Sequence, residues 1–259
     1  MVYVALSEKW YILTLWGLMF VHNLTRLDPK ENITQKALFE TEPFVFTGDK
    51  MQQDILYEAA VKYAKLRHVA YEIKLGRKGK EYNLLLHFPY DSFFHLAGIQ
   101  HLGDLKFSST NRERIFKDIL SGDLKIEYLK KSLKYEQYKV EERIANLYLL
   151  EDIIENNDVM YKINPRFYTQ YTEIVADYLL EYVDAETFYL FLVKERIYPK
   201  FENEHKGCSF FKKYYTDYTR GTSKSTLLLL NKITHFETEL ESKTEIYRSP
   251  SYKPKNEKI

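Results

Sequence analysis

The sequence of 259 residues has few of the residues that mark secreted or nucleotide-binding proteins. Its one cysteine, Cys208, cannot form a disulfide within the chain, and there is no second cysteine with which to bind zinc. A reducing compartment is the simplest explanation, so we predict a cytoplasmic protein. Glycine (9 residues) and proline (7 residues) are scarce. The chain has no glycine-rich phosphate loop, His-Glu-x-x-His or Gly-x-Ser-x-Gly motif, which disfavours nucleotide hydrolases, zinc proteases and α/β-hydrolases.

A long hydrophobic segment is also missing. The main apolar run extends from Trp10 to Val21, about twelve residues, whereas about 20 are needed to cross a bilayer. The run lacks the positive start and the cleavage site of a signal peptide. We therefore expect no stable membrane insertion, and we interpret the run as a buried helix or strand.

The pattern divides the chain into three parts. Residues 1–50 are the least regular, and we predict a poorly organised N-terminal extension. A true start at Met51 is an alternative, because a clear amphipathic helix follows that residue directly. Residues 51–248 form the predicted domain. The polar tail 249–259 contains two prolines and is predicted to be disordered.

Aromatic residues are abundant, with 23 tyrosines and 16 phenylalanines in a chain that is 45% hydrophobic. A chain of this composition can bury a sizeable core. The formal net charge is +1. Composition by itself therefore does not indicate a nucleic-acid partner, which would need basic residues gathered on one face.

Hydrophobic periodicity predicts the order of the secondary-structure elements. Helices are expected at 51–68, 111–121 (with N-caps in the segment 109–111), 124–132 and 135–157, a β-hairpin at 69–88, and strands at 172–183, 187–197, 208–215 and 225–237. Short links between the last strands indicate antiparallel pairing. The predicted fold class is α+β, with an N-terminal helix and β-hairpin, a central helical block and a C-terminal antiparallel sheet.

His95 is the strongest candidate for chemistry, in an apolar run interrupted by Gly98 and His101. An imidazole titrates near neutral pH and can act as a general base or acid. Gly98 would let a substrate backbone approach closely. The alternative is a buried histidine that bonds a backbone carbonyl. His101 would form an acid–base pair with His95 if the segment folds back, whereas on one continuous helix the two would point to different sides.

A second polar group follows Ser209 in the sequence. It consists of Asp217, Tyr218, Thr219 and Arg220. A guanidinium and a hydroxyl are suited to hold a phosphate. The alternative is a turn in which Asp217 caps the backbone and Gly221 supplies a positive φ.

The turn of the predicted hairpin is basic. Arg77 and Lys78, with Lys74 on the strand before them, are placed to contact a phosphate backbone, although solvated hairpin turns look the same. Cys208 has no neighbouring base in the sequence that would mark it as a nucleophile.

Three segments, in this order, resemble one family. They are FFHLAGIQHL at 93–102, NRERIFKDILSGDL at 111–124, and SFFKKYYTDYTRG at 209–221 leading into TLLLLNKI at 226–233. With them, the chain from about Ile55 to Ile233 resembles the fourth group of phage-associated nucleases with the barnase–EndoU–colicin–RelE fold. Lys212 and Thr222 stand where that family often has proline and glutamine.

The resemblance implies a metal-independent endoribonuclease from a phage, mobile-element or toxin-like conflict system. Its reaction would be attack of a ribose 2′-hydroxyl on the adjacent phosphate, with RNA as the substrate and no cofactor. An antitoxin or immunity protein is the partner that such a system suggests. The alternative is a non-catalytic module of the same fold that binds RNA or a protein.

The resemblance also assigns roles to the candidate residues. His95 would be the base or acid, Thr219 and Arg220 would bind the phosphate, and Ser209 and Asp217 would support them. Tyr218 would stack on a base. The remaining substrate contacts would come from Lys74, Arg77, Lys78, His101 and Lys224.

Overall fold

The computed structural model describes residues 2–6, 9–14, 17–19, 54–165, 172–196 and 199–253. The chain divides into two units, Met1–Met51 and Gln52–Ile259. The described part of the first unit is a three-stranded antiparallel sheet of β1 (Val2–Leu6), β2 (Lys9–Thr14) and β3 (Gly17–Met19). The apolar run of the sequence falls on β2 and β3 up to residue 19. Residues 20–53, which contain the alternative start, and residues 254–259 of the predicted tail lie outside the described residues.

The helices of the second unit are short. They are α1 (Ile55–Leu66), α2 (Tyr90–Leu96), the 3-10 turn η1 (Ile99–His101), α3 (Arg112–Leu120), α4 (Ile126–Leu129), α5 (Val140–Asn146), the 3-10 turn η2 (Leu147–Leu149) and α6 (Leu150–Glu155). Among them, α1 and α3 have a side-chain N-cap. Asp54 begins α1, because its carboxylate accepts hydrogen bonds from the backbone N–H groups of Leu56 and Tyr57. In the part of the chain that the structure describes, no helix is long and apolar enough to cross a membrane.

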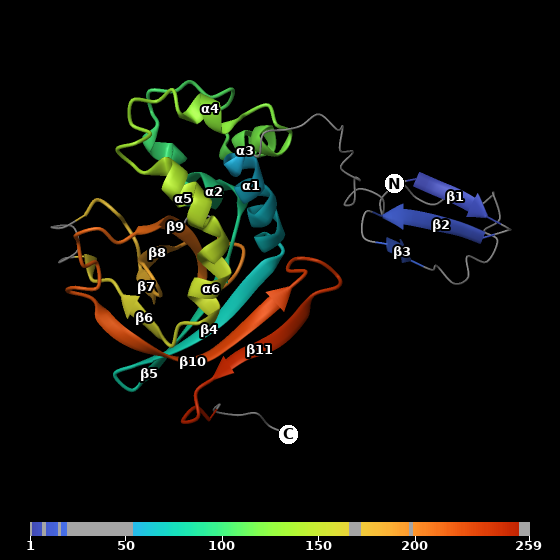
Figure 1. The fold of residues 1–259 in the computed structure, drawn as a ribbon. Helices are drawn as coiled ribbons and strands as arrows, with labels where there is room; N and C mark the ends of the chain where they lie inside the picture. Colours follow the sequence, from blue (N-terminus) through green and yellow to red (C-terminus); the bar gives the residue numbers. More distant parts are fainter. Residues whose placement is uncertain are drawn as a thin grey trace. The chain divides into compact units, whose positions relative to one another are not determined.

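The strands of the second unit form one sheet that closes on itself (Figure 1). They are β4 (Val69–Arg77), β5 (Lys80–His87), β6 (Val159–Lys162), β7 (Tyr178–Val183), β8 (Thr187–Lys194), β9 (Glu204–Lys212), β10 (Ser223–Thr234) and β11 (Ser242–Arg248). The sheet order is β11-β10-β4-β5-β9-β8-β7-β6, and β10 also pairs with β6. Seven strands therefore close into a barrel, and β11 is added outside it along β10. The sheet is mixed, because β5 and β9 run parallel.

The predicted α+β architecture is therefore wrong. The strands β4 and β5 do pair as a hairpin, but they belong to the same closed sheet as the C-terminal strands instead of forming a separate N-terminal unit. The predicted helix 135–157 is also broken. Lys139 has a φ of 51°, in the left-handed region, so the helical turns begin only at Val140 and continue as three short pieces.

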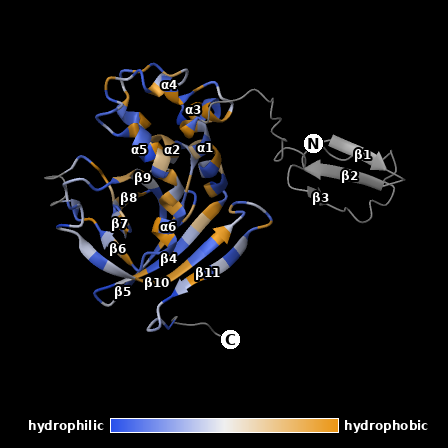
Figure 2. Cartoon of the chain, in the orientation of Figure 1, coloured by the Kyte–Doolittle hydropathy of each residue, from blue (hydrophilic) through white to orange (hydrophobic). Residues whose placement is uncertain are grey.

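The main core lies between the helices and the inward face of the closed sheet. Tyr63 from α1, Phe93 from α2, Tyr71 from β4 and Leu190 from β8 are among its fully buried side chains. In Figure 2 hydrophobic positions alternate with hydrophilic ones along the strands, and β11 is mostly hydrophilic. A second, smaller cluster contains Ala176, Leu179 and Phe191, and Ile174 packs against it. This arrangement brings α2, α5 and β9 together around a cleft.

Candidate active site

A cleft of about 950 Å³ opens between α2, η1, α5, β9 and the turn that follows β9. It is lined by His95, Gln100, His101, Gln137, Tyr138, Lys139, Arg143, residues 172–175, Cys208, Ser209, Phe211, Tyr214, Tyr215 and Tyr218. Four of the predicted site residues, His95, His101, Ser209 and Tyr218, thus meet here from distant parts of the chain. Lys139 and Arg143 bring positive charge, and among the described residues Glu173 is the one carboxylate of the lining. The cleft is therefore suited to an anionic ligand with aromatic parts.

His95 lies in the last turn of α2, half-buried at the cleft wall. Its Nε2 accepts a hydrogen bond from Nη1 of Arg112, the first residue of α3. Burial, and then the positive charge of Arg112, lowers the pKa of His95 to about 4. The imidazole is therefore neutral at neutral pH, which is the form that can take up a proton.

His101 occupies the opposite end of the same short segment, at the end of η1. Its ring stacks on Tyr138, with centroids 4.1 Å apart and an angle of 3° between the planes. Its Nε2 lies 3.1 Å from the amide nitrogen of Gln100. Burial lowers the pKa of His101, with Arg143 and Lys134 acting in the same direction. The chain folds back at Gly98, which has a φ of 75°, and so both histidines reach one cleft.

Arg143 is a cation of the cleft that the sequence did not single out, as is Lys139. It projects from α5, its Nε donates to the carbonyl oxygen of Tyr138 at 3.1 Å, and its guanidinium lies over the ring of Phe211 at 5.0 Å. Burial lowers its pKa to about 10, so it still carries a full positive charge at neutral pH. A Cβ on Gly98 would lie 2.8 Å from the Cδ of Arg143. Gly98 therefore makes room for this arginine, whereas we had predicted room for a substrate backbone.

The far wall of the cleft is aromatic. Ser209 on β9 is 5% exposed, and beside it the ring of Tyr218 packs edge-on against Tyr189, Phe191 and Phe211, with centroids 5.4 to 5.5 Å apart. At the rim, Tyr215 is 99% exposed. This wall offers ring faces and a hydroxyl to a ligand, and the predicted stacking of Tyr218 on a base stays a prediction.

Comparison with known families places this geometry in context. Residues 55–249 match the family described as phage-Barnase-EndoU-ColicinE5/D-RelE like nuclease4. The match covers α1 through β11, hence the closed sheet and the whole cleft. The chain belongs to this family of phage nucleases. Comparisons with curated proteins and with solved structures found no match.

The polar turn at residues 217–221, which was predicted to bind the phosphate, lies mostly outside the cleft lining. Asp217 Oδ1 accepts hydrogen bonds from the backbone N–H and the hydroxyl of Thr219, at 3.0 and 2.7 Å. These bonds lower the pKa of Asp217. Gly221 has a φ of 76°, and Arg220 is exposed. The geometry is that of the capped turn, the alternative that the sequence left open, and only Tyr218 of this group lines the cleft.

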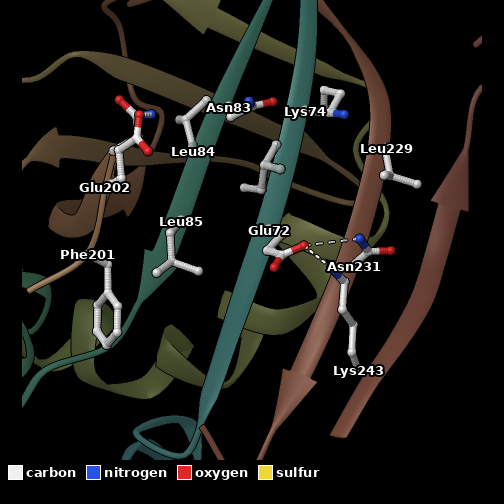
Figure 3. A pocket seen from close by; sticks show the side chains of 12 residues that line it. Glu72, Lys74, Asn83, Leu84, Leu85, Phe201, Glu202, Leu229, Asn231 and Lys243 are labelled. Atoms are coloured by element: carbon white, nitrogen blue, oxygen red, sulfur yellow. Dashed lines mark hydrogen bonds and ion pairs between the residues drawn. The ribbon is translucent and has the colours of Figure 1, made fainter. Parts of the chain in front are cut away.

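The basic residues predicted to bind substrate are also remote from the cleft lining. Lys74 lines a different pocket, of about 480 Å³, on the outer face of β4, β5 and β10 (Figure 3). Its Nζ donates to the hydroxyl of Tyr252 at 2.6 Å. Arg77 lies over the ring of Tyr82, Lys78 occupies the hairpin turn with a φ of 50°, and Lys224 is exposed at the start of β10.

Cys208 lines the same cleft, but its surroundings do not activate the thiol. Burial raises the pKa of its thiol to about 12, so the thiolate needed for nucleophilic attack is not formed at neutral pH. Within the described residues, no group of three or more His, Cys, Asp and Glu side chains is placed to hold a metal ion.

Arg112 and Arg143 are the candidate site residues that sequence reasoning missed. Both lie on predicted helices, where an arginine is usually a solvated surface residue. Their importance comes from contacts with residues far along the chain, His95 for Arg112 and both Gly98 and Phe211 for Arg143. Gly98 was the one local signal, since a glycine in an apolar run often marks a close approach.

Proposed function

We propose that this nuclease is an endoribonuclease that cleaves RNA by attack of a ribose 2′-hydroxyl on the adjacent phosphate, without a metal or other cofactor. The observation that carries the proposal is the meeting of a neutral imidazole, His95, and a half-buried cation, Arg143, in one cleft of a nuclease-family domain. This reaction requires a base for the hydroxyl proton and positive charge for the phosphoryl oxygens.

His95 is the proposed base. Its Nε2 accepts the proton of the 2′-hydroxyl while the 2′-oxygen forms a bond to phosphorus and the bond from phosphorus to the 5′-oxygen breaks. The leaving 5′-oxygen takes up a proton from water, and His95 then releases its proton to solvent, so the products are a 2′,3′-cyclic phosphate and a 5′-hydroxyl. Arg112, which donates to Nε2 in the free protein, would turn to the bound phosphate. The negative charge of that phosphate would raise the proton affinity of His95 toward neutral pH.

Arg143 is the proposed phosphate ligand. Phe211 and Gly98 hold its guanidinium in the cleft, and low exposure to water strengthens its attraction for a phosphoryl oxygen. Arg220 was assigned this role from the family resemblance, but it is exposed on a turn outside the cleft lining. We therefore assign the charge stabilisation to Arg143 and leave Ser209 in a supporting position at the wall.

The test compares RNA with DNA of the same sequence and analyses the ends of the products. The wild type should cleave RNA alone and leave 2′,3′-cyclic phosphate ends. Arg143→Ala should lower the rate roughly a hundred-fold, as expected for losing one donor to a developing anion. Arg114→Ala is the matched control, because Arg114 is an exposed arginine whose Nε pairs with Asp118 at 3.0 Å on the outer surface of α3. Cleavage of DNA at a similar rate, or 3′-hydroxyl ends, would contradict the proposal.

A further inference from the structure

A second pocket, of about 550 Å³, lies where the end of α1 meets the first residues of α2 and α3. The cleavage reaction proposed above leaves this pocket unused. Its lining includes three cations and three carboxylates, namely Arg67, Arg112, Lys200, Asp91, Glu113 and Glu237. What the pocket can bind therefore depends on which of these charges are already paired within the protein.

The carboxylates of this pocket are paired with lysines. Each forms an ion pair at 3.0 to 3.3 Å: Asp91 with Lys206, Glu113 with Lys117, and Glu237 with Lys200. The two arginines, by contrast, have no carboxylate partner among the described residues. Arg112 bonds the neutral ring of His95, and Arg67 lies over the ring of Tyr90. The charges that remain for a ligand are therefore those of the two guanidiniums, and the ligand that suits them is an anion.

Arg67 is held in place without the use of its hydrogen-bond donors. It directly follows α1 and is half-buried, and its guanidinium lies 4.2 Å from the centroid of the Tyr90 ring. Stacking on an aromatic ring leaves free the N–H groups, which lie in the guanidinium plane. In the described part of the chain, none of them has an acceptor. Arg67 therefore presents a planar fork of donors, the geometry that matches two oxygens of a phosphate.

The pocket adjoins the cleft at His95. Arg112 lines the pocket and donates to Nε2 of His95, which lines the cleft. Asp91 of the pocket precedes His95 by four residues on α2, so the two lie about one turn apart on one side of that helix. An RNA strand whose reacting nucleotide lies at His95 can therefore reach the pocket with the next part of its backbone.

We propose that this pocket binds a backbone phosphate next to the one that is cleaved, with Arg67 as its ligand and Arg112 between the two phosphates. The inference rests on the proposed function, since it assumes that RNA occupies the cleft. Phosphate contacts position a strand and do not read its sequence. Arg67 should therefore contribute to affinity for RNA of any sequence and not to the chemical step.

The experiment measures binding of a fluorescent, mixed-sequence 2′-O-methyl RNA hexamer by anisotropy at several salt concentrations. The methyl groups prevent cleavage by 2′-hydroxyl attack, so binding is measured alone. Arg67→Ala should weaken binding about ten-fold, the effect of losing one hydrogen-bonded contact to a charged group. The slope of the logarithm of affinity against the logarithm of salt concentration should become shallower by about 0.7, the contribution of one phosphate of a single strand.

Two further variants separate phosphate binding from folding. Arg77→Ala is the matched control, because Arg77 is also half-buried and lies over a tyrosine ring, 5.0 Å from the centroid of Tyr82, but lines neither the pocket nor the cleft. It should bind as the wild type does. Arg67→Lys retains the charge and should keep the salt dependence of the wild type, with weaker binding because an ammonium has no planar fork. Thermal unfolding confirms that each variant is folded.

Equal affinity of the wild type and Arg67→Ala would overturn the inference, and so would weaker binding of Arg67→Ala with an unchanged salt dependence. The same loss in Arg77→Ala, or a wild type that does not bind the hexamer, would overturn it as well. The proposed function is decided separately by cleavage. A wild type that binds through Arg67 but leaves unmodified RNA intact would contradict the proposed function and retain the phosphate site.

Discussion

Arg143 depends on a single glycine for its position. Gly98 has a φ of 75°, and a Cβ there would meet the Cδ of Arg143 at 2.8 Å. We predict that Gly98→Ala displaces the guanidinium from the cleft and lowers the cleavage rate close to that of Arg143→Ala. Cleavage rates of the two variants, measured side by side, check this prediction.

Gly122→Ala is the control for backbone strain. Gly122 also has a positive φ, of 80°, but a Cβ there would meet no atom within 4 Å. Both alanine variants should lose about 1 kcal/mol of stability, and only Gly98→Ala should lose activity. An active Gly98→Ala would show that Arg143 does not need its present position.

The protonation state of His95 gives a second prediction. Its pKa lies near 4 because of burial and the neighbouring charge of Arg112. A titration followed by NMR should find the midpoint near that value in the free protein. Arg112→Ala removes a positive charge that opposes protonation, so the midpoint should rise. A midpoint near the ordinary 6.5 in the wild type would show that burial and Arg112 do not lower the pKa of His95.

Helix α3 shows how much of an element can be predicted from local sequence. The segment 109–111 was expected to cap a helix at 111–121, and Asn111 does so, since its side chain accepts hydrogen bonds from the backbone N–H groups of Glu113 and Arg114. The cap and the helix are local, so they are readable from the sequence. The partner of Arg112, His95, lies 17 residues earlier in the chain, and no sequence pattern indicated the contact.

The cap of α3 should contribute to the stability of the domain. Asn111→Ala should lower the free energy of unfolding by about 1 kcal/mol. Asn111→Ser should retain most of it, because a serine hydroxyl can accept the same hydrogen bonds. Chemical denaturation measures both variants. Equal losses for alanine and serine would mean that the cap hydrogen bonds do not stabilise the helix.

Helix 135–157 was predicted as one element because its apolar residues keep a helical period. The structure interrupts it at Lys139, whose positive φ turns the chain so that Tyr138 stacks on His101 while Arg143 reaches Phe211. Periodicity reports which side of a segment is buried, but a single residue in the left-handed region does not disturb it. The break that builds the cleft was therefore invisible in the sequence.

Closure of the sheet is the feature that the sequence did not reveal. The hairpin strands and several C-terminal strands were located close to where the structure has them, but β6 and β11 were missed. Strand β10 pairs with β4 over residues 226–234 and with β6 over residues 223–226, and β5 lies parallel to β9. These pairings join strands that are far apart in the sequence. Alternation within a strand predicts which face is buried and does not identify the neighbouring strand, so the closed barrel needed the structure.

The stability of the folded domain should depend on pH through His205 on β9. This residue is 4% exposed, and burial lowers its pKa to about 4 from the ordinary 6.5. Between these values the unfolded chain binds more protons than the folded protein, so stability falls as the pH drops from about 6.5 to 4. The full loss from this one group is up to about 3 kcal/mol.

Unfolding of the wild type and of His205→Phe, measured at pH 7 and at pH 4.5, isolates this contribution. Removing the titrating ring should reduce the pH dependence, whatever the variant's stability at pH 7. The same pH dependence in both proteins would show that His205 protonates in the folded state as easily as in the unfolded chain.

The account rests on His95 acting as a base on RNA in this cleft, and one cleavage assay tests that directly. Mixed-sequence RNA is incubated in EDTA with the wild type, with His95→Ala, and with His68→Ala, an exposed histidine at the end of α1. The account predicts cleavage by the wild type and by His68→Ala, with 2′,3′-cyclic phosphate ends, and a rate at least about a hundred-fold lower for His95→Ala. A folded wild type that leaves the RNA intact, or a His95→Ala variant that cleaves as fast as the wild type, would contradict it.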